Sequence, residues 1–505
     1  MFRWKATAAA AITVAALALA GCAGDGGGDA PGDSSGGTLT LGAIVAPQTF
    51  DPAGAQWGNA APFYQAVFDT LLLMKPDGSV EPMLASKYAY NDDKTVLTLT
   101  LRDDVTFTDG SKLTAAVVKK NLERFQKGTS PDASTLSEVK SIEAPDDTTV
   151  VLTLKAPDPA LLNNLTRDAG LVASEKSLTA SDIATNPVGS GPYELDTKDT
   201  VTGTSYTYTK NPDYWNKSLQ HYGKLVINVY GDATSALNAI KSGEANGVKL
   251  INNDSLSEIE AAGWTINKNE LDFEGIMLYD RGGQMNKAIG NVKVRQAINM
   301  AFDRAALLKT IGSGYGTVTE QVFPKSSAGF DAALDSTYKY DPAGAKQLLA
   351  EAGYPNGFTL EMPSTSLLGA STFNLLAEQL KDIGITVKYT DVGTNYITDM
   401  LAPKFPAAFM ALEQNPDWQL IQFMISPTAT WNPFHYSDEA ANALISKIQT
   451  GDTAAVKDLN TLVVQQAWFA PLFRIQGSFA TDDRTKVTVL NTNAFPAIYD
   501  FTPKS

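Results

Sequence analysis

Residues 101–110 read Leu-Arg-Asp-Asp-Val-Thr-Phe-Thr-Asp-Gly, and the segments on either side of them set the fold class. Leu97, Leu99 and Leu101 alternate with threonines, which predicts a half-buried strand that ends where the quoted stretch begins. Asp109-Gly110 closes the stretch and predicts a turn.

A helix and another strand are predicted after this turn. Between Lys112 and Gln126 the apolar side chains recur on one helical face, and Thr114 is placed to cap the first turn. Val150 to Leu154 alternates again and predicts the next strand. A strand, a helix and a strand therefore follow one another in sequence.

The same interleaving extends through the rest of the chain, which predicts the α/β class. Further strands are predicted at 38–44, 225–229, 248–251 and 385–389, and further helices at 232–241, 291–309, 342–352 and 372–383. The chain has no internal repeat, and beyond residue 37 it has no low-complexity linker. We therefore expect domains built from discontinuous segments, with a chain that crosses between lobes more than once and so forms a hinge.

Composition narrows the function. The chain has 505 residues, 44% of them hydrophobic, and a length of this order suggests about three domains. Its net charge of −15 disfavours a nucleic-acid partner, because phosphate backbones would be repelled. A single Cys and two His exclude an internal disulfide and a zinc ribbon, and they make a His-rich metal centre a poor candidate.

The N-terminus predicts export and lipid attachment. Arg3 and Lys5 precede an apolar run from Ala6 to Ala20, which is shorter than the roughly 20 residues that span a membrane. The run ends in Leu19-Ala20-Gly21-Cys22, which resembles the lipobox of bacterial lipoproteins. We expect residues 1–21 to be a signal peptide and Cys22 to carry the lipid, although an ordinary secretory signal with a chance Cys is the alternative.

Residues 22–37 are rich in Gly, Asp, Ser and Ala, so they predict a flexible tether after the lipidated Cys. Gly32 to Gly36 matches the G-x-S-x-G hydrolase pattern. A nucleophile elbow requires a strand before it and a helix after it, and this tether predicts neither.

Catalytic motifs are missing from the body of the chain. It contains no H-E-x-x-H, no C-x-x-C and no phosphate-binding G-x-x-x-x-G-K-[ST], and Gly312 to Gly316 predicts a loop that ends a helix. His221 precedes a predicted strand and His435 lies in a turn, so neither is placed to activate a nucleophile. We expect no catalytic residues, no metal and no cofactor, but a carboxylate pair remains open among 55 acids.

An ordered series of motifs resembles the large extracellular solute-binding lipoproteins of ABC importers, the oligopeptide, dipeptide and nickel class. The resemblance covers nearly the whole mature chain, through stretches that occur in family order: Thr49 to Pro52, Leu101 to Gly110, Pro187 to Tyr193, Asn211 to Trp215, Val294 to Ile298, Phe302 to Arg304, and Tyr340 to Pro355. Within them, we expect Gly189 and Gly191 to allow a tight turn, and Arg295 and Arg304 to brace helices rather than touch ligand.

The resemblance implies a two-lobed periplasmic-binding-protein-like fold with an extra inserted domain. Carried onto this chain, the first lobe takes residues 38–74, 186–272 and 476–505, the inserted domain takes 75–185, and the second lobe takes 273–475. The lobes are expected to close on ligand by hinge motion and to present it to a membrane permease.

The sequence departs from the peptide-binding members in two places. Where those members often carry G-W-x-x-D, whose Asp pairs with a peptide amino group, residues 410–418 lack the Gly-Trp pair, and Glu413 or Asp417 could substitute. The loop at 363–369 lacks the Arg that dipeptide binders tend to place there for a carboxylate. A short zwitterionic peptide is therefore less expected than the family name suggests.

Neutral hydrogen-bonding groups and aromatic rings remain as the main candidates for ligand contact. With the two possible acids, the predicted binding residues are Gln56, Trp57, Glu413, Gln414, Asn415, Asp417, Trp418 and Trp431. Amides and flat rings suit sugars, other neutral polar solutes, or peptide backbones held without end recognition.

Two classes of function follow. The first is a binding lipoprotein, not an enzyme, that captures a peptide or a neutral oligomer such as an oligosaccharide and delivers it to ABC permease subunits. The second is a surface-anchored hydrolase with a carboxylate pair. We expect a monomer on the outer face of the cytoplasmic membrane, held there by the lipid at Cys22.

Overall fold

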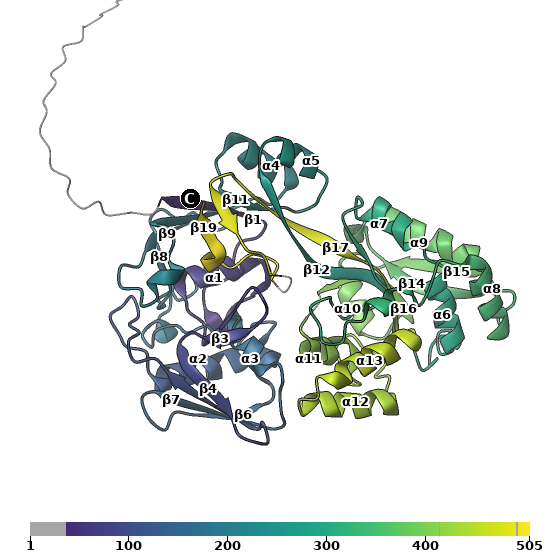
Figure 1. The fold of residues 1–505 in the computed structure, drawn as a ribbon, viewed down its shortest axis with the longest axis horizontal. Coiled ribbons are helices and arrows are strands. Elements are labelled where there is room, and N and C mark those ends of the chain that lie inside the picture. Colours follow the sequence, from purple (N-terminus) through teal and green to yellow (C-terminus); the bar gives the residue numbers. More distant parts are fainter. Residues whose placement is uncertain (1–36, 414, 491–492, 505) are drawn as a thin grey trace, which may run out of the picture. The chain divides into compact units, whose positions relative to one another are not determined.

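The computed structural model describes residues 37–413, 415–490 and 493–504, so the predicted signal peptide, Cys22 and the tether before Gly37 lie outside the described residues. Helices and strands alternate along the described chain, as the sequence predicts for an α/β protein (Figure 1). None of the helices in the described part of the chain is both long and apolar enough to cross a bilayer.

A nine-stranded sheet runs through both lobes. Its strands lie in the order β16-β12-β17-β11-β1-β10-β9-β8, with β13 paired to β17. The bounds are β1 (Thr38–Ala43), β8 (Tyr193–Leu195), β9 (Ser205–Lys210), β10 (Lys224–Val229), β11 (Gly247–Lys249), β12 (Thr265–Leu278), β13 (Gly316–Val318), β16 (Ala407–Glu413) and β17 (Phe469–Thr481).

The first lobe is built around β1, which pairs in parallel with β10 and β11. Leu39 and Leu41 of β1 are buried together with aromatic side chains from α1 (Ala61–Val67), because the alternation of β1 turns its leucines to one face. The remaining elements here are β18 (Thr485–Val487), β19 (Phe501–Pro503), α4 (Ala233–Ser242) and α5 (Leu256–Ala261).

The inserted domain contains an antiparallel sheet in the order β4-β5-β7-β6 with α2 packed on it. Leu97, Leu99 and Leu101 of β5 are buried as their alternation predicts, and Thr114 caps α2 by accepting the Val117 N–H. The bounds are β4 (Ala85–Tyr90), β5 (Val96–Leu101), β6 (Val139–Glu143), β7 (Thr149–Leu154), α2 (Ala115–Gln126) and α3 (Leu161–Asn164), with β2 (Leu72–Met74) and β3 (Val80–Pro82) pairing beside them.

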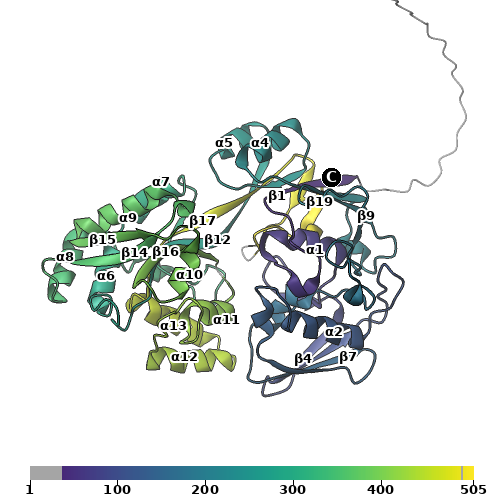
Figure 2. The same ribbon diagram turned by 180° about the vertical axis from the view of Figure 1, so that it is seen from behind.

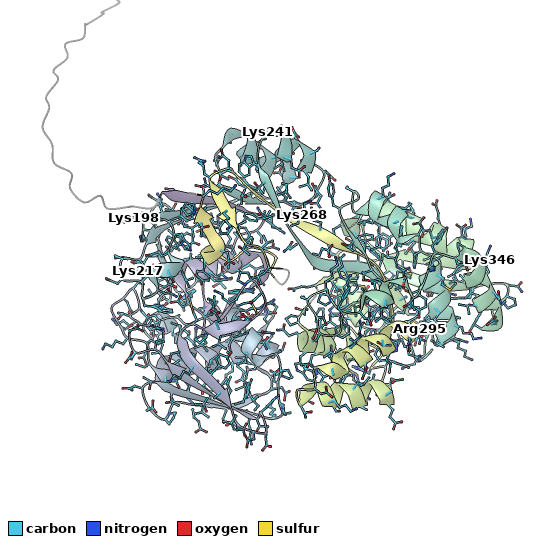
Figure 3. All side chains as sticks on the ribbon, viewed as in Figure 1. Lys198, Lys217, Lys241, Lys268, Arg295 and Lys346 are labelled. Carbon is cyan, nitrogen blue, oxygen red and sulfur yellow. The ribbon has the colours of Figure 1, made fainter. Side chains whose placement is uncertain are left out.

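The second lobe has the largest hydrophobic core and most of the helices. Arg295 lies in this lobe (Figure 3). Its guanidinium donates to the carbonyls of Gln466, Ala467, Ile289 and Gly290, so it braces the lobe as predicted. The further bounds are α6 (Val292–Met300), α7 (Arg304–Ile311), α8 (Pro342–Glu351), α9 (Ala370–Asp382), α10 (Tyr396–Leu401), α11 (Asp417–Leu420), α12 (Glu439–Gln449), α13 (Ala454–Gln465), β14 (Phe358–Ser364) and β15 (Ile385–Asp391).

Two long antiparallel strands, β12 and β17, connect the lobes (Figures 1 and 2). One end of the pair lies beside β11 in the first lobe, and the other end lies beside β16 in the second. The register of the pair shifts between Asn269 and Asp272, so the ladder is irregular where the chain passes from one lobe to the other. The predicted domain boundaries near residues 272 and 475 stay a prediction.

One local prediction was wrong. Residues 291–309 form two helices, α6 and α7, rather than one. Asp303 lies between them and its carboxylate accepts the Ala306 N–H, so it starts a new helix instead of continuing the first.

Gly189 and Gly191 do not form a turn that needs positive φ. They are required because their backbone passes against Val67: a Cβ added at Gly189 would lie 2.1 Å from the Val67 carbonyl oxygen. The Gly191 N–H also donates to this carbonyl, at 2.8 Å. The glycines therefore serve a close backbone approach.

Candidate functional site

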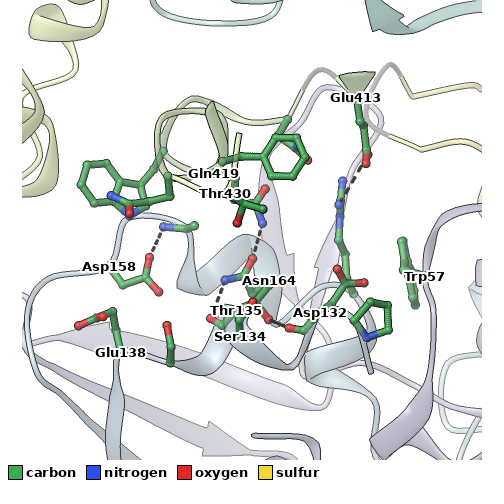
Figure 4. A pocket seen from close by; sticks show the side chains of 18 of the residues that line it. Trp57, Asp132, Ser134, Thr135, Glu138, Asp158, Asn164, Glu413, Gln419 and Thr430 are labelled. Carbon is green, nitrogen blue, oxygen red and sulfur yellow. Dashed lines mark hydrogen bonds and ion pairs between the residues drawn. The ribbon is translucent and has the colours of Figure 1, made fainter. Parts of the chain in front are cut away.

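A cavity of about 630 Å³ is lined by residues from the inserted domain, the first lobe and the second lobe (Figure 4). Segments far apart in sequence meet here. Trp57, Gly58 and Ala494 belong to the first lobe, residues 131–168 to the inserted domain, and residues 413–449 to the second lobe. We refer to this cavity as the interlobe pocket.

The inserted-domain wall is held by a chain of short polar contacts. Thr135, in the 3₁₀ turn η3 (Ala133–Leu136), donates from its hydroxyl to the Asp132 carbonyl at 2.6 Å. Asn164, at the end of α3, donates to the Thr135 carbonyl at 3.1 Å. These bonds fix the backbone that carries Asp132, so its carboxylate is presented by an ordered wall.

The second-lobe wall begins where β16 ends. Glu413 is the last residue of β16, and Trp418 and Gln419 follow in α11. The π-helical segment η10 (Ile421–Ile425) continues directly from α11. A π-helical turn is rare and frequently occurs at functional sites.

Three contacts cross the pocket from one wall to the other. Arg167 Nη1 lies 4.0 Å from Glu413 Oε1. Gln419 donates from Nε2 to Asn164 Oδ1, and Gln449 donates from Nε2 to the Pro157 carbonyl at 3.2 Å. The two walls therefore touch directly, through polar groups that a moving lobe could break and remake.

Acidic groups dominate the charge of the lining. Among the described residues of the lining, five carboxylates face a single guanidinium, that of Arg167. Figure 4 shows two of the acids at one end of the pocket, and two others with Trp57 at the opposite end. The five acids are Asp132, Glu138, Asp158, Asp168 and Glu413.

Asp158 and Glu138 form the first group, which we call the Asp158 pair. Asp158 is buried, and burial raises its pKa to about 6, with a further rise from the charge of Glu138. The Ala160 N–H donates to Asp158 Oδ1 at 3.0 Å, and this hydrogen bond lowers the pKa of Asp158. No cation within the described lining lies beside this pair, which explains why desolvation prevails.

Asp132, Asp168 and Glu413 form the second group, which surrounds Arg167 and which we call the Arg167 group. Burial raises the pKa of Asp168 well above its usual value, and the charge of Asp132 adds to the rise, while Arg167 opposes it. Burial also raises the pKa of Glu413, again against the effect of Arg167. One guanidinium is thus shared among several acids.

Two buried polar atoms of the lining residues have no hydrogen-bond partner among the residues that the structure describes. They are the indole Nε1 of Trp57, whose side chain is 5% exposed, and the Oε1 of Gln419. One is a donor and the other an acceptor. Unpaired buried polar groups are rare in proteins and cost free energy, so these two atoms are suited to a ligand that supplies the missing partners.

The structure brings four of the predicted binding residues into the lining, namely Trp57, Glu413, Asn415 and Trp418. The other predicted residues are placed elsewhere, apart from Gln414, which lies outside the described residues. Whether any of the predicted residues binds ligand stays a prediction.

The remaining three predicted residues have other surroundings. Gln56 is exposed and does not line the pocket. Asp417 accepts the Ala328 N–H at 3.2 Å and is not among the lining residues. Trp431 packs against Phe423 in the second-lobe core, with ring centroids 5.8 Å apart.

Sequence reasoning missed the whole contribution of the inserted domain. It expected mainly amides and aromatic rings with Glu413 or Asp417 as possible acids, whereas four of the five carboxylates of the described lining come from residues 132–168. These acids sit in loops and short helical turns without a shared motif, so no local pattern marks them as neighbours. The acidic lining is a result of tertiary structure.

Comparisons with known proteins agree with this architecture. The sequence matches the family profile described as bacterial extracellular solute-binding proteins, family 5 Middle, over residues 79–436. It is 30% identical over 443 residues to the glutathione-binding protein GsiB of Salmonella typhi, with 82% of this chain and 83% of that protein covered.

Two solved structures share the fold. HbpA2 from Haemophilus parasuis superposes with a TM-score of 0.81 at 23% identity, covering 93% of this chain and 100% of that one. The periplasmic binding protein DppA from Helicobacter pylori, in complex with the peptide STSA, superposes with a TM-score of 0.74 at 24% identity, covering 93% of this chain and 98% of that one.

Proposed function

The chain belongs to the bacterial extracellular solute-binding proteins of family 5, and on this premise we propose that it captures a peptide or peptide-like solute between its two lobes for an ABC importer. The solute would then be handed to the transmembrane permease subunits. The family consists of substrate-binding proteins rather than enzymes, so the proposed role is binding and delivery without covalent chemistry.

The interlobe pocket is the observation that carries this proposal. It has a volume of about 630 Å³, which lies in the usual range for small-molecule sites, and its walls come from both lobes. The contacts Arg167–Glu413 and Gln449–Pro157 join those walls around the cavity. A ligand held there would be enclosed by closure about β12 and β17.

Peptide-like chemistry suits the unpaired groups of the pocket. The Trp57 indole N–H can donate to a peptide carbonyl, and Gln419 Oε1 can accept from a peptide N–H. Trp57 and Trp418 also offer flat surfaces that would stack on sugar rings. An oligosaccharide is therefore the appropriate comparison ligand.

Lipid attachment belongs to the same proposal. Cleavage before Cys22 would make this residue the N-terminus of a diacylated protein, and two acyl chains suffice for stable anchoring. The tether would then hold a monomeric body near the permease on the outer face of the membrane. The proposed division of the chain is lobe one at 38–74, 186–272 and 476–505, an inserted domain at 75–185, and lobe two at 273–475.

Calorimetric titration of the full-length protein, produced in a bacterial host, tests the function. We expect trialanine to bind and maltotriose to give no heat. Trp57→Phe keeps an aromatic ring but removes the indole N–H, so it should weaken trialanine binding by about fivefold to tenfold. The neighbouring Gln56→Ala is the matched control, because Gln56 is exposed outside the lining.

The outcomes separate the candidates. If maltotriose binds and trialanine does not, the ligand class is an oligosaccharide and not a peptide. Shortened products after prolonged incubation, detected by mass spectrometry, would favour the hydrolase. Equal losses in the Trp57 and Gln56 variants would place the binding site outside the interlobe pocket.

A further inference from the structure

The interlobe pocket has more negative charge than its own cation can balance. Five carboxylates and one guanidinium line it. Burial makes an uncompensated carboxylate costly, because the protein interior replaces water poorly as a solvent for charge. A ligand that brings positive charge would relieve this cost, whereas a ligand that brings a carboxylate would add to it.

Arg167 is already engaged by the protein. Its guanidinium lies 4.0 Å from the Glu413 carboxylate and acts electrostatically on Asp168, its neighbour in sequence. A carboxylate from the ligand would have to compete with these acids for the same cation. The Arg167 group is therefore a poor site for an anionic ligand.

The Asp158 pair has a different balance. Asp158 is 9% exposed, and among the described lining residues there is no cation next to it or Glu138. Asp158 Oδ1 accepts from the Ala160 N–H, which leaves the second carboxylate oxygen available. This pair offers charge-assisted hydrogen bonds to an ammonium or guanidinium group.

A metal ion is a less suitable source of the positive charge. Within the described residues, no group of three or more His, Cys, Asp or Glu side chains is arranged to hold one. The acids lie at two ends of the pocket, separated by Ser134, Thr135 and Asn164 (Figure 4). An extended organic cation can reach both ends, and a single ion cannot.

The indole of Trp57 points to a peptide rather than a simple amine. Trp57 is 5% exposed, lines the pocket, and has an N–H without an acceptor in the described part of the chain. A diamine or polyamine has no oxygen to accept this hydrogen bond, whereas each peptide unit has a carbonyl. This observation is independent of the charge of the pocket.

We propose that the ligand is a short basic peptide, with a lysine or arginine side chain held by Asp158 and Glu138, a backbone carbonyl held by Trp57, and its other end near the Arg167 group. This inference rests on the proposed function of peptide capture and specifies the class of peptide. It also separates this chain from the relative named for glutathione, because glutathione carries two carboxylates and one ammonium group.

The test compares ligands of one length that differ in one charge. The full-length protein is titrated calorimetrically with trialanine, with its three single-lysine variants, with Ala-Glu-Ala, with glutathione and with cadaverine. We expect the best lysine peptide to bind about tenfold more tightly than trialanine. Ala-Glu-Ala and glutathione should bind more weakly than trialanine.

Variants then locate the preference. Asp158→Asn removes the charge but keeps an oxygen that can accept the Ala160 N–H, so the local fold is retained. We expect it to lower the affinity for the best lysine peptide more than the affinity for trialanine, and the double variant with Glu138→Gln to bring the two affinities within about twofold of each other. Asp103→Asn is the control, since Asp103 is an exposed acid of the inserted domain outside the pocket lining.

Each outcome decides something. Equal affinity for lysine peptides and trialanine would refute the basic-peptide inference and leave peptide capture intact, as would tighter binding of glutathione. A lysine preference that survives in the double variant would refute its assignment to the Asp158 pair. If no peptide binds, whether or not cadaverine does, both peptide capture and the basic-peptide inference are refuted.

Discussion

Lowering the pH should weaken the binding of a basic peptide through Asp158. In the ligand-free protein, burial raises the pKa of Asp158 to about 6, and Glu138 contributes to the rise. Tyr90 also interacts electrostatically with this carboxylate, while Trp418 and Gln449 border the pocket from the second lobe. A ligand cation beside Asp158 favours its ionised form, so a protein that is protonated there must lose the proton before it binds.

The size of the effect follows from the raised pKa. At pH 5 only about a tenth of the ligand-free molecules carry an ionised Asp158, whereas at pH 7.5 nearly all do. The dissociation constant for a lysine peptide should therefore be about tenfold higher at pH 5 than at pH 7.5. Burial also raises the pKa values of Asp168 and Glu413, with Asp132, Asp272 and Arg167 acting on them, so the part of the pH dependence that belongs to Asp158 is the part that Asp158→Asn removes.

Peptide affinity should rise with pH, whereas the contribution of Asp158 to the stability of the ligand-free protein should fall with pH. Because the folded state binds the Asp158 proton more tightly than the unfolded chain, this group stabilises the fold less as the pH rises through about 6. A rise from 3.8 to about 6 corresponds to about 3 kcal/mol. Asp158→Asn should thus raise the free energy of unfolding at pH 8 by up to about 3 kcal/mol and leave it nearly unchanged at pH 4.

Two assays on the same preparations test this reasoning. Calorimetric titration at pH 5 and pH 7.5 gives the affinities of wild type and Asp158→Asn for the best lysine peptide. Urea unfolding at pH 4 and pH 8 gives their stabilities. If the variant keeps the full pH dependence of binding, or is less stable than wild type at pH 8, then Asp158 is not the uncompensated carboxylate described above.

Substitutions at three further positions test other parts of the protein. Arg295→Met should cost at least about 3 kcal/mol of unfolding free energy by urea denaturation, since it leaves several buried carbonyls without a donor; a loss below 1 kcal/mol would contradict the bracing role. Asp303→Ala removes the cap of α7 and should lower the same free energy by about 1 kcal/mol, whereas Asp303→Asn, which can still cap, should cost much less. Cys22→Ser should abolish labelling by radioactive palmitate and release the protein from the membrane fraction, and membrane retention in this variant would show that the lipid is not the anchor.

Local patterns predicted the elements of the fold well because their causes are local. The alternation in β5 and the cap at Thr114 depend on residues within one element, and both appear in the structure as expected. The break between α6 and α7 was missed because the apolar spacing continues through Phe302. The apolar pattern alone places Asp303 inside one helix, although Asp is also a strong N-cap.

Gly189 and Gly191 show a different limit. The motif marked both positions as requiring glycine, but it could not say why. The cause is the Val67 backbone, which is remote in sequence and approaches too closely for any Cβ. A glycine needed for close packing and a glycine needed for positive φ have the same appearance in a single sequence.

The pocket shows the same limit for function. Trp57, Asn415 and Trp418 could be proposed from residue type and family position, and they line the cavity. Asp158 and Glu138 could not, because a carboxylate on a loop is ordinarily solvated and its sequence neighbours do not reveal burial. Asp158 is buried and lines a cavity that Trp418 and Gln449 border from a separate part of the chain. The proposed charge preference thus rests on groups that the fold brings together from separate parts of the chain, and no sequence motif records that arrangement.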